Sequence, residues 1–204
     1  GLRPEINHAK YKYFLSRISD TNVIKDKWAT VKKIIAKKTN PTYAEHLKER
    51  NKMFTVFANR EFHLSRRYNS FSELSKATTE YAAFVVGSDQ LWLPSNIAAN
   101  YYTLNFVPLQ IPKIALSTSF GISQLPKAQA EMAKKFLPRI DYCSIRETSG
   151  QKLIKELTGR EVPVVCDPTI LFTAEEWSKE ISQDKFISEK YLFCYFLGNN
   201  PIHR

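Results

Sequence analysis

The sequence predicts an α/β fold with a Rossmann-like parallel sheet and flanking helices. Three observations predict it. Short, mostly apolar runs recur from residue 81 onward, helical patterns separate the later runs, and the runs are apolar throughout, which is typical of strands covered on both faces. The runs are residues 82–86, 113–117, 142–145, 162–166 and 191–196. Strands that alternate with helices at this spacing form βαβ units, and such units build a parallel sheet.

The first 80 residues are predicted to be helical, because no glycine occurs between Leu2 and Val86 and the stretch is rich in Lys, Glu, Ala and Leu. In residues 24–38, apolar side chains recur at three- and four-residue spacing while lysines fill the other positions. We expect this apolar stripe, which includes Trp28, Val31, Ile34 and Ile35, to pack on the sheet domain. A second helix is expected over residues 42–59, after Asn40 and Pro41.

The patterns between the later runs predict helices over residues 127–137, 148–157 and 174–181. A charged stretch at 182–190 then separates the last run from the others. We therefore expect three parts: a mainly helical, basic segment (1–80) packed on the sheet, a Rossmann-like domain (81–189), and the start of a second α/β domain (190–204) whose remainder is absent. A lone strand is not stable by itself, so we expect the sequence to be a fragment.

The net charge of +10 is concentrated at the start of the chain. Residues 1–80 hold 17 Lys and Arg against 8 Asp and Glu, whereas residues 81–204 hold 13 against 12. A basic block of this kind meets phosphate or an anionic lipid surface, or is simply a solvated helical face. We expect no nucleic acid partner, because the basic residues are not interleaved with aromatic residues in a recognisable module. Peripheral attraction to a membrane is a further hypothesis, without insertion.

Several classes of protein are disfavoured by missing motifs. No Walker sequence, GxGxxG or GxSxG occurs, which argues against P-loop enzymes, dinucleotide enzymes and α/β-hydrolases. The four histidines lie outside the strand exits, and the three cysteines form no CxxC pair, so we expect no metal and no cofactor. The cysteines are interpreted as buried free thiols, typical of a reducing cytoplasm. The longest apolar run, residues 191–197, is too short to span a bilayer.

Ligands of open parallel sheets bind at the carboxyl ends of the strands, so the residues after each run are the candidates for the site. Asp89 is suited to accept a proton from a sugar hydroxyl, or else it forms a turn or a helix cap. Arg146 is suited to grip a carboxylate or phosphate, or else it pairs with Glu147 or Asp167. Asp167 is interpreted mainly as a structural stop before Pro168. Trp92 is interpreted as a core residue rather than a sugar-stacking one.

Four motifs in this order resemble the polysaccharide pyruvyl transferase family over residues 80–200. They are Gly87 to Trp92, Lys113–Ala115 with Ser119 to Gly121, Ser144 to Glu147 with Gly150, and Asp167 to Thr169. The resemblance implies the first half of a twin-domain, glycosyltransferase-B-like architecture. It also implies transfer of a pyruvyl group from phosphoenolpyruvate to a sugar as a cyclic ketal. The chain departs from the family pattern in lacking an opening strand and the later half. Residues 1–80 carry no family signature.

The reaction implied by the resemblance assigns roles to the residues at the strand exits. We expect Asp89 and Arg146 to be catalytic, and we expect substrate contacts from Ser88, Gln90, Ser119 and Asp167. The partners are then phosphoenolpyruvate and a polysaccharide or lipid-linked glycan acceptor, in the cytoplasm and peripherally at the inner membrane face. The alternatives are a nucleotide-sugar glycosyltransferase of the same architecture and, less favoured, a binding protein without catalysis.

Overall fold

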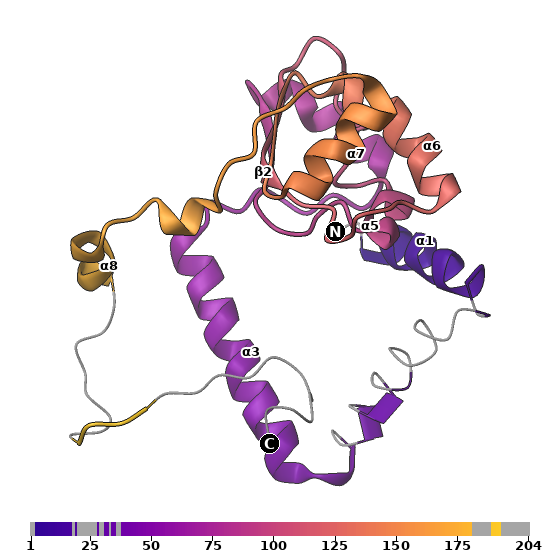
Figure 1. Cartoon of the computed structure of the whole chain (residues 1–204). Helices are drawn as coiled ribbons and strands as arrows, with labels where there is room; N and C mark the ends of the chain where they lie inside the picture. Colours follow the sequence, from indigo (N-terminus) through magenta and orange to yellow (C-terminus); the bar gives the residue numbers. More distant parts are fainter. Residues whose placement is uncertain are drawn as a thin grey trace. The chain divides into compact units, whose positions relative to one another are not determined.

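The computed structural model describes residues 3–17, 19, 28, 31–32, 34–35, 38–180 and 189–192. The chain divides into two compact units, Gly1–Asp167 and Pro168–Arg204. The first unit contains α1 (Arg3–Leu15), α3 (Pro41–Glu61), α4 (Phe71–Lys76), η1 (Ala77–Glu80), β1 (Phe84–Gly87), α5 (Pro94–Ala99), β2 (Lys113–Thr118), α6 (Lys127–Phe136), η2 (Leu137–Arg139), β3 (Tyr142–Ile145) and α7 (Thr148–Thr158) (Figure 1). The second contains η3 (Pro168–Ile170) and α8 (Ala174–Glu180).

The sheet has three parallel strands in the order β1-β2-β3. Phe84 is in register with Lys113, and Ile114 with Tyr142. The predicted α/β class with a parallel, helix-flanked sheet is therefore confirmed. The fourth predicted strand is reduced to a single parallel bridge between Ile145 and Val164. Of the fifth run, residues 191–192 have neither helix nor strand structure, and the others lie outside the described residues. The twin-domain architecture and the three-part domain division remain predictions.

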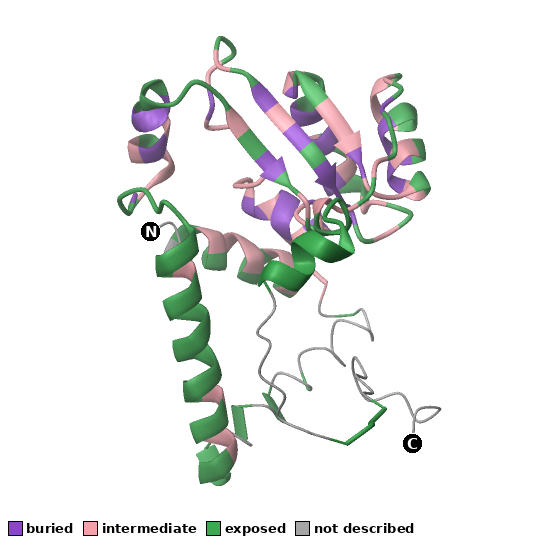
Figure 2. Cartoon of the chain, turned by 90° about the vertical axis from the view of Figure 1, so that its left-hand side faces the viewer, coloured by how far each residue is buried: buried purple, intermediate pink, exposed green. Residues whose placement is uncertain are grey.

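Helices α5, α6 and α7 cover one face of the sheet. Val86, Ala115 and Ile145 point from the three strands into a core that α6 and α7 complete with Phe136 and Ile154. Figures 1 and 2 show these helices beside the strands. Burial of such apolar side chains stabilises the fold by about 1.5–3 kcal/mol for each one.

Trp92 fills the centre of this core. It is fully buried, and its ring lies 5.2 Å from that of Phe120 and 5.4 Å from that of Phe136. Its indole N–H donates to the carbonyl of Tyr102 at 3.1 Å, which satisfies the one polar group of the ring. The interpretation of Trp92 as a core residue is confirmed.

The opposite face of the sheet is exposed among the described residues. Val85, Leu116 and Tyr142 alternate with the core positions along their strands and are all exposed (Figure 2). The sequence predicted strands covered on both faces, because the runs are apolar at every position. Alternation in the structure means that half of each run faces the helices, whereas Val85, Leu116 and Tyr142 on the other side are exposed.

Two parts of the basic N-terminal segment pack within the first unit. Helix α1 contacts α5, and Ile6 packs against a small buried cluster of Tyr68, Leu74 and Ala77. The Glu5 carboxylate also accepts a hydrogen bond from the backbone N–H of Phe71 at 3.3 Å.

The helix predicted at 42–59 is present as α3. It begins at the expected Asn40-Pro41 signal, where the Asn40 side chain accepts from the N–H of Tyr43 at 3.0 Å. No residue of α3 is buried. Trp28, Val31, Ile34 and Ile35 are exposed as well, in contrast to the core-facing stripe expected from their spacing. None of the helices in the described part of the chain is long and apolar enough to cross a membrane.

Lys113, the first residue of β2, is almost fully buried and fully satisfied. Its ammonium group donates to the carbonyls of Pro108, Leu109 and Ile111 at 2.7–3.4 Å, and it lies 3.5 Å from the Asp141 carboxylate. A buried charge is tolerated only with such partners. Lys113 therefore holds the loop before β2 in place by these hydrogen bonds. This structural role accounts for a lysine at this position of the motif.

Candidate functional site

The carboxyl ends of β1, β2 and β3 lie at the same edge of the sheet, because all three strands are parallel neighbours. The sequence analysis expected the residues after the apolar runs to lie at the carboxyl ends of parallel strands, and this is confirmed for the runs that form β1, β2 and β3. The bridge between Ile145 and Val164 brings the segment that leads to Asp167 to the same edge. The four motifs therefore meet in space.

Arg146, Asp167 and Ser88 form the centre of this edge. The Nη1 atom of Arg146 donates to Oδ2 of Asp167 at 2.6 Å, and the hydroxyl of Ser88 donates to the same oxygen at 3.3 Å. The Arg146 and Asp167 side chains are 29% and 25% exposed, so the pair is sheltered but open to a ligand. Three residues that the sequence assigned to the site, from three different strand exits, thus contact one another. The ion pair with Asp167, an alternative raised by the sequence, is present.

Backbone hydrogen bonds hold Arg146 and Asp167 in place. The Arg146 N–H donates to the carbonyl of Thr118, and Ile145 bonds in both directions with the segment 163–165. The hydroxyl of Ser117 donates to the carbonyl of Cys166 at 2.8 Å, directly before Asp167. Because these bonds come from β2 and β3, the position of the ion pair is set by the sheet and not by a loose loop.

Asp89 lies on the first loop of the same edge and is exposed. Its Oδ1 atom accepts from the N–H of Gln90 at 2.7 Å, and its backbone carbonyl accepts from the N–H of Ser119 at 3.2 Å. The Asp89 side chain thus bonds to the next residue of the loop, which is neither the helix cap nor the two-residue side-chain turn raised as alternatives. An exposed carboxylate on a loop tied to β2 is also in a position to meet a ligand at the surface.

Gln90 and Ser119 differ in accessibility. Gln90 is exposed, and its side chain lies against Gly121, where a Cβ atom would come within 3.1 Å of Gln90 Cδ. Ser119 is only 3% exposed, and its hydroxyl oxygen accepts from the N–H of Gly121 at 3.0 Å. Ser119 therefore shapes the loop, and Gln90 is the more accessible of the two to a substrate.

Three positioning residues were missed by the sequence analysis, although two of them belong to the motifs. Ser117 supports the segment before Asp167, and the Ser144 hydroxyl joins β3 to β2 by bonding the N–H of Ser117 and the carbonyl of Ala115. The Glu147 carboxylate accepts from the N–H of Phe120 at 2.9 Å. The small residue Gly150 leaves room for it, since a Cβ there would lie 2.9 Å from Glu147 Oε1. For Ser144 and Glu147, membership of a motif was the signal that could have identified them. Their hydrogen-bond partners are distant in the sequence, so the sequence did not show what these residues contact.

The two described cysteines are free but differ from one another. Burial raises the pKa of the Cys143 thiol to about 11. Cys166 is exposed, in contrast to the buried thiol expected from its apolar run. Cys194 lies outside the described residues. In the described part of the chain, no three His, Cys, Asp or Glu side chains gather as metal ligands do.

A parallel α/β sheet with charged and hydroxyl side chains at its carboxyl edge defines the class of α/β proteins that bind ligands at strand ends. The family model of polysaccharide pyruvyl transferases matches residues 2–201, and the chain belongs to this family. It is therefore a transferase, of a family named for pyruvyl transfer onto polysaccharide. The match includes residues 2–80, for which no signature was recognised in the sequence. Searches of curated proteins and of solved structures found no match.

Proposed function

We propose that the chain takes part in transfer of a pyruvyl group from phosphoenolpyruvate to a sugar, forming a cyclic ketal. The observation that carries this proposal is the cluster of Arg146, Asp167 and Ser88 at the carboxyl edge, in a chain of the polysaccharide pyruvyl transferase family. The donor carries a carboxylate and a phosphate, so its site needs a cation. Arg146 is the cation at the centre of the cluster.

The chemistry requires two additions to one carbon. A sugar hydroxyl adds to C2 of phosphoenolpyruvate while its proton passes to a base and an acid protonates C3, which becomes the methyl group. A second hydroxyl of the same sugar then displaces phosphate from C2 and closes the ketal, and the proton of that hydroxyl leaves with the phosphate. Because both hydroxyls come from one sugar, the acceptor must be held in one orientation. The site thus needs an anion clamp, a base and acceptor contacts.

Arg146 is proposed as the anion clamp. Asp167 engages Nη1, which orients the guanidinium plane and leaves its other edge for a carboxylate or phosphate of the donor. Asp167 is then a positioning residue as well as a candidate substrate contact. The Ser88 hydroxyl donates to the same Asp167 oxygen as Arg146, so it links the loop after β1 to the segment that contains Asp167.

Asp89 is proposed as the group that takes the proton of the acceptor hydroxyl. Its carboxylate is exposed at the same edge, and one of its oxygens is held by the N–H of Gln90. Gln90 is exposed beside it and is proposed as an acceptor contact. Ser119, which is buried, is proposed to act by shaping the loop that faces Gln90.

The test is release of phosphate from phosphoenolpyruvate that depends on an acceptor glycan, with the ketal identified by NMR when the donor is labelled with ¹³C at C2. Arg146→Lys keeps the charge but loses the planar fork, so we expect at least a tenfold loss of kcat/KM with an unchanged unfolding midpoint. Lys134→Arg, at an exposed position of α6, is the control and should leave kcat/KM unchanged. Unchanged turnover in Arg146→Lys would remove Arg146 from the site.

The same experiment distinguishes pyruvyl transfer from the alternative function, glycosyl transfer. A nucleotide-sugar glycosyltransferase with this fold would transfer a sugar to the acceptor and release no phosphate from phosphoenolpyruvate. Its donor would be a nucleotide sugar, and phosphoenolpyruvate would not be consumed. Product analysis by mass spectrometry therefore distinguishes a pyruvyl from a glycosyl addition.

We also propose that the full enzyme has a twin-domain architecture and works in the cytoplasm, held peripherally at the inner membrane face. The twin-domain architecture and the cytoplasmic location rest on the family resemblance alone. The support for the membrane attraction is the net charge of +9 on residues 1–80, together with the exposed side chains of Trp28 and Ile35. Anionic lipid attracts each nearby cation by about 1 kcal/mol. Co-sedimentation with anionic vesicles at low salt is expected, with loss at high salt. Equal sedimentation with neutral vesicles contradicts it.

A further inference from the structure

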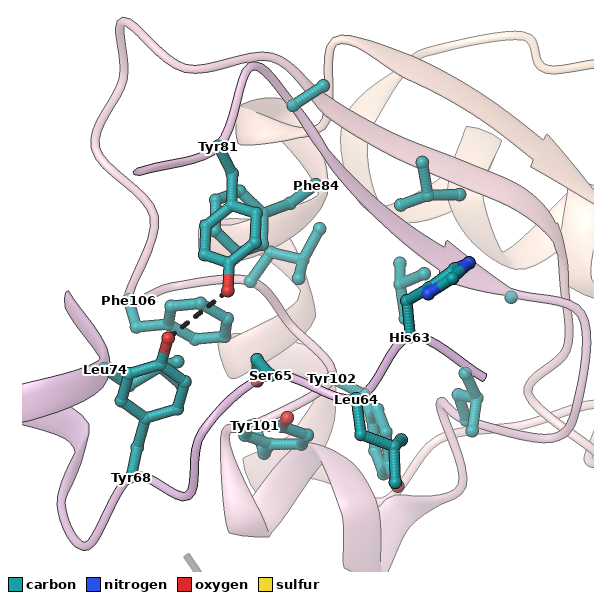
Figure 3. Close-up of a pocket in the computed structure, with 16 residues that line it drawn as sticks. His63, Leu64, Ser65, Tyr68, Leu74, Tyr81, Phe84, Tyr101, Tyr102 and Phe106 are labelled. Atoms are coloured by element: carbon teal, nitrogen blue, oxygen red, sulfur yellow. Dashed lines mark hydrogen bonds between the residues drawn. The ribbon is translucent and has the colours of Figure 1, made fainter. Parts of the chain in front are cut away.

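A cavity of about 490 Å³ lies beside β1 and outside the cluster of Arg146 and Asp167 (Figure 3). Its volume is within the range of about 300–1,000 Å³ that is usual for ligand pockets. The walls come from three parts of the chain: residues 63–68 with Leu74, residues 81–91, and residues 101–106. We call it the tyrosine cavity, after four of its lining residues, Tyr68, Tyr81, Tyr101 and Tyr102.

Aromatic rings that pack on one another build much of the wall. Phe106 lies edge-on to Phe84, with ring centres 5.6 Å apart, and is stacked on Tyr101 at 5.8 Å. Phe84 in turn contacts the ring of Tyr81 at 5.4 Å. These contacts restrain the rings before any ligand arrives, so the wall is largely preformed and little side-chain entropy is lost on binding.

The lining is aromatic but not purely apolar. Among the described residues that line the cavity, none is Asp, Glu, Lys or Arg. The hydroxyls of Tyr68 and Tyr81 lie 3.3 Å apart, and this hydrogen bond raises the pKa of Tyr68. Burial raises the pKa of Tyr101. The hydroxyls of Tyr68 and Tyr101 are thus protonated at neutral pH and are able to donate and accept hydrogen bonds.

This chemistry discriminates between ligands. An anion such as phosphoenolpyruvate would find no lysine or arginine among the lining residues to balance its charge. Arg66 lies 5.1 Å from the centre of the Tyr68 ring, but it does not line the cavity and is paired with Glu73 and Glu80. A purely aliphatic ligand would offer no hydrogen-bonding group to the tyrosine hydroxyls. A neutral sugar ring meets both demands, because its C–H face packs on aromatic rings while its hydroxyls bond with the tyrosine hydroxyls and with His63.

The cavity also adjoins the candidate site along β1. Gly87 lines it, and the next residues of the chain are Ser88 and Asp89. Figure 3 shows His63 beside the carboxyl end of this strand, with Tyr81 and Phe84 farther back along it. A glycan whose reacting sugar lies at Asp89 is therefore able to place a neighbouring sugar in the tyrosine cavity.

We propose that the tyrosine cavity is a subsite for a neutral, non-reacting sugar ring of the acceptor glycan. This inference rests on the proposed function and adds a place where the enzyme holds the acceptor away from the reacting centre. It predicts that acceptors of two or more sugars bind more tightly than single sugars.

The direct test is ¹⁹F NMR of the full chain labelled with 3-fluorotyrosine. The resonances of Tyr81, Tyr101, Tyr102 and Tyr142 are assigned from single Tyr→Phe variants. The probes are three neutral disaccharides (lactose, cellobiose and maltose), with p-cresol as an aromatic and 1-hexanol as an aliphatic comparison. We expect at least one disaccharide to shift the resonances of Tyr81, Tyr101 and Tyr102 saturably. Tyr142 is the internal control, because it is exposed on the open sheet face and does not line the cavity.

A matched pair of variants then measures the contribution of the wall. Tyr81 and Tyr142 are both exposed tyrosines of the first unit. Tyr81→Ala should weaken disaccharide binding about tenfold, while Tyr142→Ala should leave it within a factor of about two. If Tyr81→Ala lowers the unfolding midpoint strongly, Tyr81→Phe keeps the ring, removes only the hydroxyl, and should weaken binding severalfold.

The inference is overturned if none of the disaccharides shifts the cavity tyrosines, if only p-cresol or 1-hexanol does, or if Tyr142→Ala weakens binding as much as Tyr81→Ala. These titrations contain no phosphoenolpyruvate, so their outcome is separate from that of the proposed function. Sugar binding without phosphate release would support the subsite and contradict the reaction. Phosphate release that is unaffected in a folded Tyr81→Ala variant, with no tyrosine shifts, would support the reaction and contradict the subsite.

Discussion

Replacing Gly87 by alanine should destabilise the protein far more than the same change at Gly159. Both glycines have a positive φ, +150° for Gly87 and +73° for Gly159. Their surroundings differ. A Cβ at Gly87 would lie 1.9 Å from the carbonyl oxygen of Leu116, whereas a Cβ at Gly159 would meet nothing within 4 Å. The pair therefore separates backbone strain from a steric clash.

The expected magnitudes follow from these two terms. Strain at an unfavourable φ costs on the order of 1–3 kcal/mol, and forcing an atom into a packed site costs about 1–3 kcal/mol more. The Leu116 carbonyl belongs to β2 and is paired in register with Gly87, so it moves only if the ladder between β1 and β2 is disturbed. We expect Gly87→Ala to lower the free energy of unfolding by about 2–6 kcal/mol. Gly159→Ala should cost about 1 kcal/mol, since the alanine also restricts the unfolded chain.

Urea denaturation followed by far-UV circular dichroism measures both values. The wild type, Gly87→Ala and Gly159→Ala are compared at one protein concentration, and a constant m-value shows that the same surface is exposed on unfolding. If the two variants lose the same free energy within about 0.5 kcal/mol, the close approach of β1 to β2 does not determine the cost. Ser88 of the candidate site directly follows Gly87 in the chain. A Gly87→Ala variant that still folds should therefore also lose activity, because the change displaces Ser88.

Three further predictions concern buried and titrating groups. Lys113→Met should cost about 3 kcal/mol in urea unfolding, because it leaves the carbonyls of the loop before β2 without their donor; a loss below about 1 kcal/mol would contradict this. The backbone N–H of Lys113 lowers the pKa of Asp141, so its stabilising effect is present above the unfolded pKa and is lost as the pH falls through the lower folded pKa. Stability should therefore fall less steeply in Asp141→Asn than in the wild type below about pH 4, and parallel curves would refute it. Iodoacetamide at pH 7.5 should alkylate the exposed Cys166 and spare Cys143, whose thiol is held protonated by burial, and peptide mass spectrometry shows which one reacts.

The structure also explains why some site assignments were within reach of the sequence. Residues that follow parallel strands meet at one edge of the sheet, so Ser88, Arg146 and Asp167 were expected near one another from their places after the apolar runs, and the structure brings them into contact. Ser119 was assigned by the same rule, but its hydroxyl turns inward to the N–H of Gly121. A strand exit fixes where a residue is, and the local turn decides which way its side chain points.

The sequence by itself determined the α/β class, the family and the core position of Trp92, because apolar runs, helical spacing and motif order are properties of neighbouring residues. Only the tertiary structure decided that Arg146 pairs with Asp167, that Val85 and Leu116 are exposed, and that aromatic residues between 68 and 106 line a cavity. The physical reason is that hydrogen bonds, burial and cavities depend on atoms far apart in the chain. Their distances are set by how the helices pack on the sheet, which local patterns do not encode.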